Sequence, residues 1–260
     1  SDVCSSDLAE QRAPPSDIRT AVSTARTIGL HARVICGKGA QAMNRVTRTI
    51  VSVVGMLLAL AGIDHGFFEI LQGNAPTNGL IIQAIGDEQQ MWFYGTEEAF
   101  TVLPTFLLTG IPAVTVSLGL GIWAVGYVHA RHGARVFGLL CVLLFLVGGG
   151  IAAAMTLAPI TWAAATRIHR PLTWWRRVLP ARARPMLARL WPYSLSLASA
   201  SFLIGLSIAV FGYVPGVHDP ERIFAVCWAF VFGGGLGGFL LSFVAGFASD
   251  IEAQARAEAS

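Results

Sequence analysis

Five long apolar stretches recur along the chain, and the polar segments between them alternate in charge. The apolar stretches are 47–68, 99–128, 136–166, 193–214 and 223–248. Acidic residues gather in 73–98 and 215–222, whereas arginines gather in 129–135 and 167–191. About 20 apolar helical residues cross a bilayer, and arginines mark the cytoplasmic loops. The pattern predicts an all-α, polytopic transmembrane helix bundle in a cell (inner) membrane.

The stretch 136–166 is too long for one comfortable crossing, and both of its flanks are rich in arginine. Gly148-Gly149-Gly150 lies near its middle. Two short helices that meet at this glycine triplet keep both flanks on the cytoplasmic side, whereas one long tilted helix places one basic flank outside. We therefore expect a helical hairpin or a re-entrant pair. The hairpin gives about six crossings with both termini cytoplasmic, and the single helix gives five.

The segment between the first two spans predicts a helix on the outer surface. Residues near helical spacing are Leu80, Ile81, Ala84, Ile85, Glu88, Met91 and Trp92. No basic residue occurs in this segment. We expect a short amphipathic helix near 79–92 that lies on the outer interface. Pro104 and Pro112 interrupt the second span, which predicts a kink.

The segment 167–191 combines arginines with tryptophans, and prolines divide it into short pieces. Aromatic rings and arginines suit the headgroup layer of the cytoplasmic leaflet, where each charge near anionic lipid gains about 1 kcal/mol. We expect the lipid bilayer and its anionic headgroups as partners of this segment. The predicted headgroup contacts are Trp174, Trp175, Arg176, Arg177, Arg182 and Arg184.

The N-terminal segment 1–42 is predicted to be separate from the membrane domain. Residues 1–8 match the translation of a common sequencing-library adaptor, and no methionine precedes Met43. We expect 1–42 to be a non-native, disordered read-through extension and 43–250 to be the transmembrane helical domain, followed by a cytoplasmic tail at 251–260. A cleaved targeting peptide is the alternative, since the extension is rich in Arg, Ala and Ser.

Composition narrows the chemistry. Hydrophobic residues make up 54% of the chain and charged residues 13%, against roughly a quarter charged in soluble domains. The mean hydropathy is +0.62. No lysine follows Lys38, which excludes Schiff-base chemistry from the membrane part. Cys141 and Cys227 lie inside apolar spans and are expected to be inert packing residues. We expect no cofactor and no nucleic-acid partner.

The sharpest local signal is a row of ionisable residues at the outer end of the first span. On a helix His65 and Glu69 lie one turn apart and face the same way, with Asp64 on a neighbouring face. With Glu97 and Glu98, which begin the second span, they are candidates for a cation-attracting outer vestibule. A carboxylate beside an imidazole also suits a divalent transition metal. Structural pairing is the favoured interpretation, followed by a cation or proton site and then by a catalytic site.

The chain lacks the catalytic residues and motifs of several classes of membrane enzyme. From Met43 onward the histidines are His65, His129, His132, His169 and His218. These are too few for the histidine boxes of di-iron hydroxylases, so His129 and His132 are expected to be polar caps at a turn. No Walker, GxSxG, HExxH or GxGxxG motif occurs in this part. Since no nucleophile–base constellation is visible either, an enzyme is the least favoured class.

Glycines in the last span predict close helix packing. Gly233 with Gly237 and Gly234 with Gly238 form overlapping GxxxG pairs, and small residues let helices approach closely. The previous span offers a similar small face made of Ser201, Gly205 and Ala209. Packing of these two spans within the chain is favoured over a homo-oligomer.

Two stretches resemble an uncharacterised family of bacterial and archaeal polytopic membrane proteins. They are 62–74 (GIDHGFFEILQGN) and 171–180 (PLTWWRRVLP). The resemblance covers Met43 to about Asp250 and implies a membrane helical fold, with Met43 as the start. It implies no activity, because none is established for that family. The N-terminal extension is where this chain departs from it.

Two functions fit these residues. A small transporter or channel-like protein is favoured by the intramembrane Asp64, His65 and Glu69. A non-catalytic protein that organises lipid or partner subunits is favoured by the Trp/Arg segment and by the glycine-rich last span.

Overall fold

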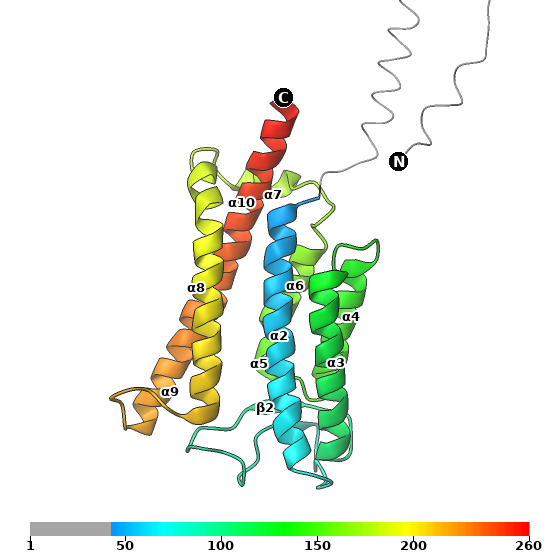
Figure 1. Cartoon of the computed structure of the whole chain (residues 1–260), viewed down its shortest axis with the longest axis vertical. Helices are drawn as coiled ribbons and strands as arrows, with labels where there is room; N and C mark the ends of the chain where they lie inside the picture. Colours follow the sequence, from blue (N-terminus) through cyan, green and yellow to red (C-terminus); the bar gives the residue numbers. More distant parts are fainter. Residues whose placement is uncertain (1–42, 260) are drawn as a thin grey trace, which may run out of the picture. The chain divides into compact units, whose positions relative to one another are not determined.

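The computed structural model describes residues 43–259, which fold into an all-α helical bundle (Figure 1). Four helical runs in this part of the chain are long and apolar enough to cross a membrane. They are α2 (Arg45–Leu71), α3 (Phe106–Gly126), α8 (Arg184–Phe211) and the continuous run of α9 (Pro220–Trp228), π-helix η1 (Ala229–Gly237) and α10 (Gly238–Ala259). The predicted fold class is confirmed, and the length and composition of these helices indicate a membrane-embedded protein. The predicted read-through segment 1–42 lies outside the described residues.

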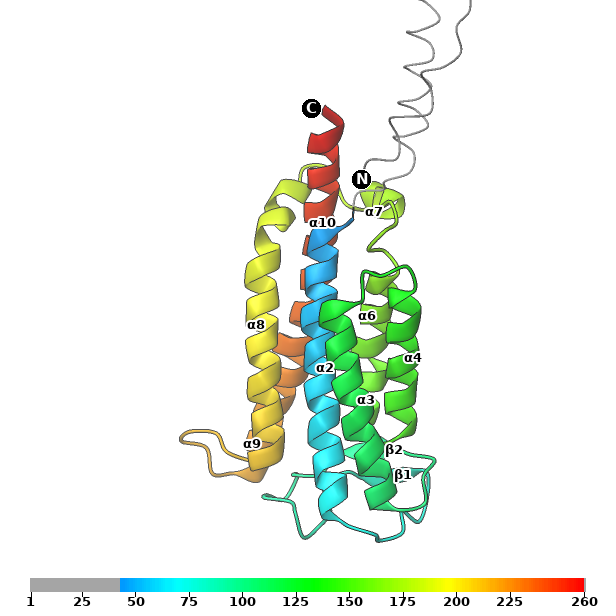
Figure 2. The same cartoon turned by 45° about the vertical axis from the view of Figure 1, so that its right-hand side comes forward.

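The stretch 136–166 forms the expected hairpin. α4 (Gly133–Leu146) is one arm, and α5 (Ile151–Met155) with α6 (Leu157–Ala165) is the other, so that α4 and α6 run side by side (Figures 1 and 2). The turn requires glycine, because Gly148 and Gly150 have φ angles of +102° and +84°. The bundle thus has six helical passes. At 1.5 Å per residue α4 is about 21 Å long, shorter than a bilayer core of about 30 Å.

Charged residues mark the two ends of the bundle. The arginine end comprises the start of α2, the α3–α4 turn, the segment from α6 through α7 (Thr173–Val178) to the start of α8, and the end of α10 (Figure 1). The opposite end is called the β-hairpin end, because residues 81–83 and 98–100 pair there as two strands. Within residues 43–259, every arginine except Arg222 belongs to the arginine end. The two ends of the described chain also lie there, so the charge asymmetry of the sequence exists in space.

A two-stranded hairpin stands where a helix near 79–92 was expected, so that prediction is wrong. β1 (Ile81–Gln83) pairs antiparallel with β2 (Glu98–Phe100), with Ile82 opposite Ala99. The hairpin and its loops lie under the ends of α2 and α3 (Figure 2). It therefore closes this end of the bundle, as the amphipathic helix was expected to do.

The hairpin forms because its apolar residues alternate and because α2 supplies a partner. Ile82 and Ala84 are buried while Ile81 and Gln83 are exposed, which is the period of a strand. Gln72, just past α2, donates from its side-chain amide to the backbone oxygens of Gln83 (3.1 Å) and Ala84 (2.8 Å). The same apolar residues also fit a helical spacing, and these tertiary contacts decide between the two.

The second span starts later than expected. α3 begins at Phe106, because residues 98–100 pair in the hairpin. The Thr105 hydroxyl caps its first turn by accepting a hydrogen bond from a backbone N–H. Pro104 thus precedes the helix and cannot kink it, and Pro112 lies inside.

α8 and α10 extend beyond their apolar stretches. α8 starts at Arg184 and runs through Pro192, so prolines break the basic segment less than expected. α10 continues to Ala259, and the predicted tail 251–260 is helical in its described part. Both extensions carry the charges of the arginine end on continuous helices.

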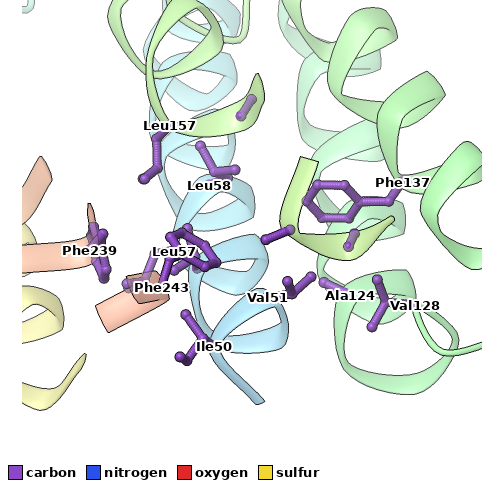
Figure 3. Packing of buried hydrophobic residues seen from close by; sticks show 14 of the residues in the cluster. Ile50, Val51, Leu57, Leu58, Ala124, Val128, Phe137, Leu157, Phe239 and Phe243 are labelled. Atoms are coloured by element: carbon purple, nitrogen blue, oxygen red, sulfur yellow. The ribbon is translucent and has the colours of Figure 1, made fainter. Parts of the chain in front are cut away.

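α2 forms the centre of the apolar core. The packed side chains in Figure 3 include Ile50, Val51, Leu57 and Leu58 of α2 with Phe137 of α4, Leu157 of α6, and Phe239 and Phe243 of α10. α3 approaches α2 closely, because a Cβ atom at Gly66 would lie 2.8 Å from the backbone oxygen of Gly110. Small residues at helix crossings are typical of membrane bundles. This packing fixes the position of the ionisable residues at the end of α2.

Polar contacts fix the start of α2 at the arginine end. The buried Asp250 carboxylate accepts hydrogen bonds from the Val46 N–H (3.1 Å), the Thr47 N–H (2.9 Å) and the Thr47 hydroxyl (2.7 Å). The Asn44 side chain donates to the backbone oxygen of Arg167 at 2.6 Å. α10 therefore caps the free N–H groups of α2, where the helix dipole favours a carboxylate.

Candidate functional site

A cleft opens between two groups of helices at the β-hairpin end. α4, α5 and α6 pack with one another and with α2, whereas α9 and η1 pack with α8. Between the groups lies a cavity of about 390 Å³ whose walls come from α2, α5, α6, α8, α9, η1 and the loop that leads into β2. This volume lies in the range of small-molecule sites, which are mostly apolar with a few polar groups.

The polar corner of the cleft is a histidine–glutamate pair. Nε2 of His65 lies 2.6 Å from Oε2 of Glu97. His65 is buried on α2, whereas the Glu97 side chain is 41% exposed and lines the cavity. Burial opposes ionisation of Glu97, but the charge and the hydrogen bond of His65 outweigh it and hold the pKa of the Glu97 carboxyl below its usual value. Glu97 therefore presents a charged carboxylate to the cleft.

Glu69 lies one helical turn beyond His65 and is fully buried. Within the described residues, neither carboxylate oxygen of Glu69 has a hydrogen-bond partner, and Nδ1 of His65 has none. The glycine turn of the α4–α5 hairpin covers both side chains. A Cβ atom at Gly150 would lie 2.9 Å from the His65 ring, and one at Gly148 would lie 2.6 Å from Oε2 of Glu69. Buried polar atoms without partners are rare and costly, so this spot is a candidate functional site.

The residues predicted to form one vestibule separate into several places. His65, Glu97 and Glu98 line the cleft. Asp64 instead faces a second cavity of about 480 Å³ between α2 and α8. His65 pairs with Glu97 and not with Glu69, which lies behind the glycine turn. In the described part of the chain, no group of three or more His, Cys, Asp or Glu side chains could hold a metal ion.

A row of aromatic rings lines the other wall of the cleft. The rings are Trp92, Tyr94, Phe224, Trp228 and Phe232, with successive centroids 5.7, 4.8, 5.6 and 4.5 Å apart. At these distances the rings form one continuous apolar surface. The three rings of α9 and η1 recur every fourth residue, a helical spacing that the sequence contains but that the span pattern did not single out. The two loop rings join them only through the fold.

The comparisons with known proteins add no further constraint. No protein-family model, curated protein or solved structure matches the chain. The resemblance drawn from 62–74 and 171–180 therefore stays a prediction, and the candidate site rests on its geometry.

The π-helix η1 supplies part of the cleft wall. Val231, Phe232 and Leu236 of η1 line the cleft. π-helical segments are rare and occur frequently at functional sites. Here the π-helix interrupts a 40-residue helical run where that run borders the cavity. This is a second reason, independent of the ionisable residues, to treat the cleft as a candidate site.

The glycines predicted to pack divide between two faces of this run. Gly234 and Gly238 face α8, whereas Gly233 and Gly237 do not. A Cβ atom at Gly234 would lie 2.5 Å from the Ser201 hydroxyl, and one at Gly238 would lie 2.8 Å from a Cβ atom of α8. No atom lies within 4 Å of such a Cβ at Gly233. One half of the glycine motif thus packs inside the chain.

The six residues predicted to contact lipid headgroups fall into two groups, one exposed and one with contacts inside the protein. The exposed ones are Trp174, Arg177 and Arg182. The ring of Trp175 packs on Phe247 at 4.7 Å, and Arg176 pairs with Glu258 at 3.3 Å. Arg184 donates to backbone oxygens of the α7 segment. Three of the six therefore hold the arginine end together, and three remain available to lipid.

Proposed function

We propose that the chain is an integral membrane transport protein that binds a small molecule in the cleft and exchanges it with a proton held around His65. The position of His65 and Glu69 carries the proposal. Both contain buried atoms without partners, in a helix long enough to cross a membrane, and His65 lines a cavity of small-molecule size. Ionisable groups inside a span are costly to keep and mark ligand or proton sites.

The uneven distribution of arginines between the two ends favours one orientation of the bundle in the membrane. Arginines gather on the cytoplasmic side of multi-pass membrane proteins, so we propose that the arginine end faces the cytoplasm of the cell (inner) membrane. Both ends of the described chain are then cytoplasmic. The cleft, its carboxylates and the β-hairpin lie in the outer half of the membrane and at its outer surface.

The exchange follows from the charge of the His65–Glu97 pair. With a proton on both nitrogens of His65 the pair is neutral overall, and with one proton fewer the negative charge of Glu97 is uncompensated. A ligand that needs this charge therefore competes with the proton for the same corner. Glu69 is a further place for a proton, because an uncharged carboxyl avoids the cost of an unpaired buried charge.

Filling the cleft tests the binding part of this proposal. Ala153 lines the cavity, whereas Ala163 is exposed on the same helical hairpin. Purified protein in lipid nanodiscs should bind the neutral fluorophore N-phenyl-1-naphthylamine saturably. Ala153→Trp should abolish this binding and Ala163→Trp, the matched control, should not. Equal binding by all three proteins would overturn the proposal.

Infrared difference spectroscopy tests the proton part. The wild-type protein should show the C=O stretch of a protonated carboxyl in an apolar environment. Glu69→Gln should remove that band, and Asp87→Asn, in an exposed turn at the same end, should keep it. A wild-type spectrum without such a band would remove Glu69 as a proton site.

The exposed side chains of the arginine end favour a second function, the organisation of anionic lipid. Trp174, Arg177 and Arg182 are free to meet headgroups, and each arginine near an anionic surface gains about 1 kcal/mol. Native mass spectrometry should find anionic phospholipid bound to the purified protein. The double change Arg177→Gln and Arg182→Gln should release it, while Arg222→Gln at the other end should not. Retention by the double variant would remove this function's support.

A further inference from the structure

We infer that the ligand of the cleft is a lipophilic organic cation, a positively charged centre carried on flat apolar groups. This inference rests on the proposed function, because it names the class of small molecule that the cleft takes. Three independent features of the cleft carry it: the sign of its charges, the aromatic wall and the place where it opens.

The charged side chains that line the cleft favour a cation. They are His65, Glu97 and Glu98, and no lysine or arginine of the described residues is among them. Oε2 of Glu97 bonds His65, and no hydrogen bond within the described residues engages Oε1. Arg222, the one arginine described at this end, lies 3.4 Å from Asp219 and does not line the cavity. An anionic ligand would meet the carboxylates without a compensating charge, which is costly in a partly apolar site.

The aromatic wall supplies the second half of the recognition. The faces of tryptophan, tyrosine and phenylalanine rings carry partial negative charge and attract cations, most strongly where water is excluded. They also stack with flat apolar groups. Trp92 is held in place, because its indole N–H donates to the backbone oxygen of Ala209 at 2.8 Å. The row of five rings begins at this fixed tryptophan, which lies in the same loop as Glu97.

The opening of the cleft fits a molecule that arrives through the membrane. Phe224 and Trp228 line the cavity, are 39% and 49% exposed, and belong to a helical run long and apolar enough to cross a membrane. In the proposed orientation, these two partly exposed rings form the lip of the cleft on the lipid side. Amphipathic cations gather in the interfacial layer of a bilayer, which in the proposed orientation is where this lip lies. A solute without apolar groups would not reach the cleft through the bilayer.

Two probes of equal shape and opposite charge test the inference. Radiolabelled tetraphenylphosphonium should bind saturably to the purified protein in uncharged detergent micelles. Tetraphenylborate, the matching anion, should not compete, whereas N-phenyl-1-naphthylamine should. Competition by tetraphenylborate as strong as that of unlabelled tetraphenylphosphonium would overturn the assignment of charge.

Glu97→Gln removes the charge and keeps the size of the side chain, so the affinity for tetraphenylphosphonium should fall about tenfold, as expected for the loss of one close charge pair. Glu88→Gln is the matched control, because Glu88 is an exposed acidic residue of the same loop outside the cavity. It should bind as the wild type does. A folded Glu97→Gln protein with wild-type affinity would overturn the inference.

Trp228→Leu provides a second variant in case Glu97→Gln fails to fold, because its ring lies at the exposed lip. Its affinity for the cation should fall several-fold, and unchanged affinity would count against the aromatic wall. The two proposals fail differently. Binding of the neutral fluorophore without binding of the cation would refute the organic cation and leave the cleft as a ligand site. The loss of both would refute the proposed function as well.

Discussion

Replacing Gly148 with alanine should destabilise the fold for two separable reasons. Gly148 has a φ of +102°, where an L side chain is strained by about 1–3 kcal/mol. The new Cβ atom would also lie 2.6 Å from Oε2 and 2.7 Å from Cδ of Glu69, an overlap that costs about 1–3 kcal/mol. We therefore expect Gly148→Ala to lower the free energy of unfolding by about 2–6 kcal/mol.

A double-mutant cycle separates the two costs. Glu69→Ala removes the overlap and leaves the backbone strain. The loss of unfolding free energy in the double variant should therefore be about 1–3 kcal/mol smaller than the sum of the losses in the two single variants. Gly73→Ala is the control for strain alone. Its φ is +67°, and no atom lies within 4 Å of its Cβ position, so it should lose only the strain component.

Unfolding in mixed micelles titrated with sodium dodecyl sulfate, followed by circular dichroism, measures these free energies. The cycle depends on the contact between the glycine turn and Glu69, which is the contact that buries the carboxyl. The losses of unfolding free energy for Gly148→Ala and Glu69→Ala could instead add to within about 0.5 kcal/mol in the double variant. The glycine turn would then not contact the Glu69 carboxyl, and the explanation of its burial would be refuted.

Three further predictions concern stability, each measured by unfolding. Asp250→Ala should cost about 2–4 kcal/mol, because three hydrogen bonds at the start of α2 are lost; a smaller loss than Glu252→Ala would contradict it. Because the pKa of Glu97 is held below its usual value of 4.5, its pairing with His65 stabilises the fold above pH 4.5 and loses this effect as the pH falls through the lowered pKa. Glu97→Gln should therefore flatten the dependence of the unfolding temperature on pH below 4.5, and an unchanged profile would refute this. Gly234→Leu should cost more than about 2 kcal/mol, since its side chain would enter α8, and the outward Gly233→Leu less than about 0.5 kcal/mol; equal costs would argue against this packing.

The helical passes could be predicted because they depend on local composition. Apolar length and the position of arginines are properties of the sequence alone. The hairpin at Gly148–Gly150 could be predicted for the same reason, since both flanks of 136–166 are basic. The error at 79–92 shows the limit of such patterns. Its apolar residues satisfy both a helical and a strand period, and the choice depends on Gln72 and β2, which lie outside the window.

The composition of the cleft could be predicted only in part. His65 stood out because it is ionisable inside a span, but its partner Glu97 is 32 residues away, and no local pattern chooses between it and Glu69. The contact between Tyr94 and Phe224 likewise joins a loop to a helix far along the chain. No local pattern predicts that the β-hairpin folds under the bundle. This position of the hairpin brings the loop rings and Glu97 to the cleft.

Cysteine labelling measures directly on which side of the membrane the cleft opens. Single cysteines introduced as Asp87→Cys at the β-hairpin end and Arg177→Cys at the arginine end, in a background without the native cysteines, can be labelled with a membrane-impermeant maleimide in intact cells. We predict that residue 87 is labelled from outside and residue 177 only after the membrane is permeabilised. Labelling of residue 177 in intact cells, with residue 87 protected, would contradict this prediction.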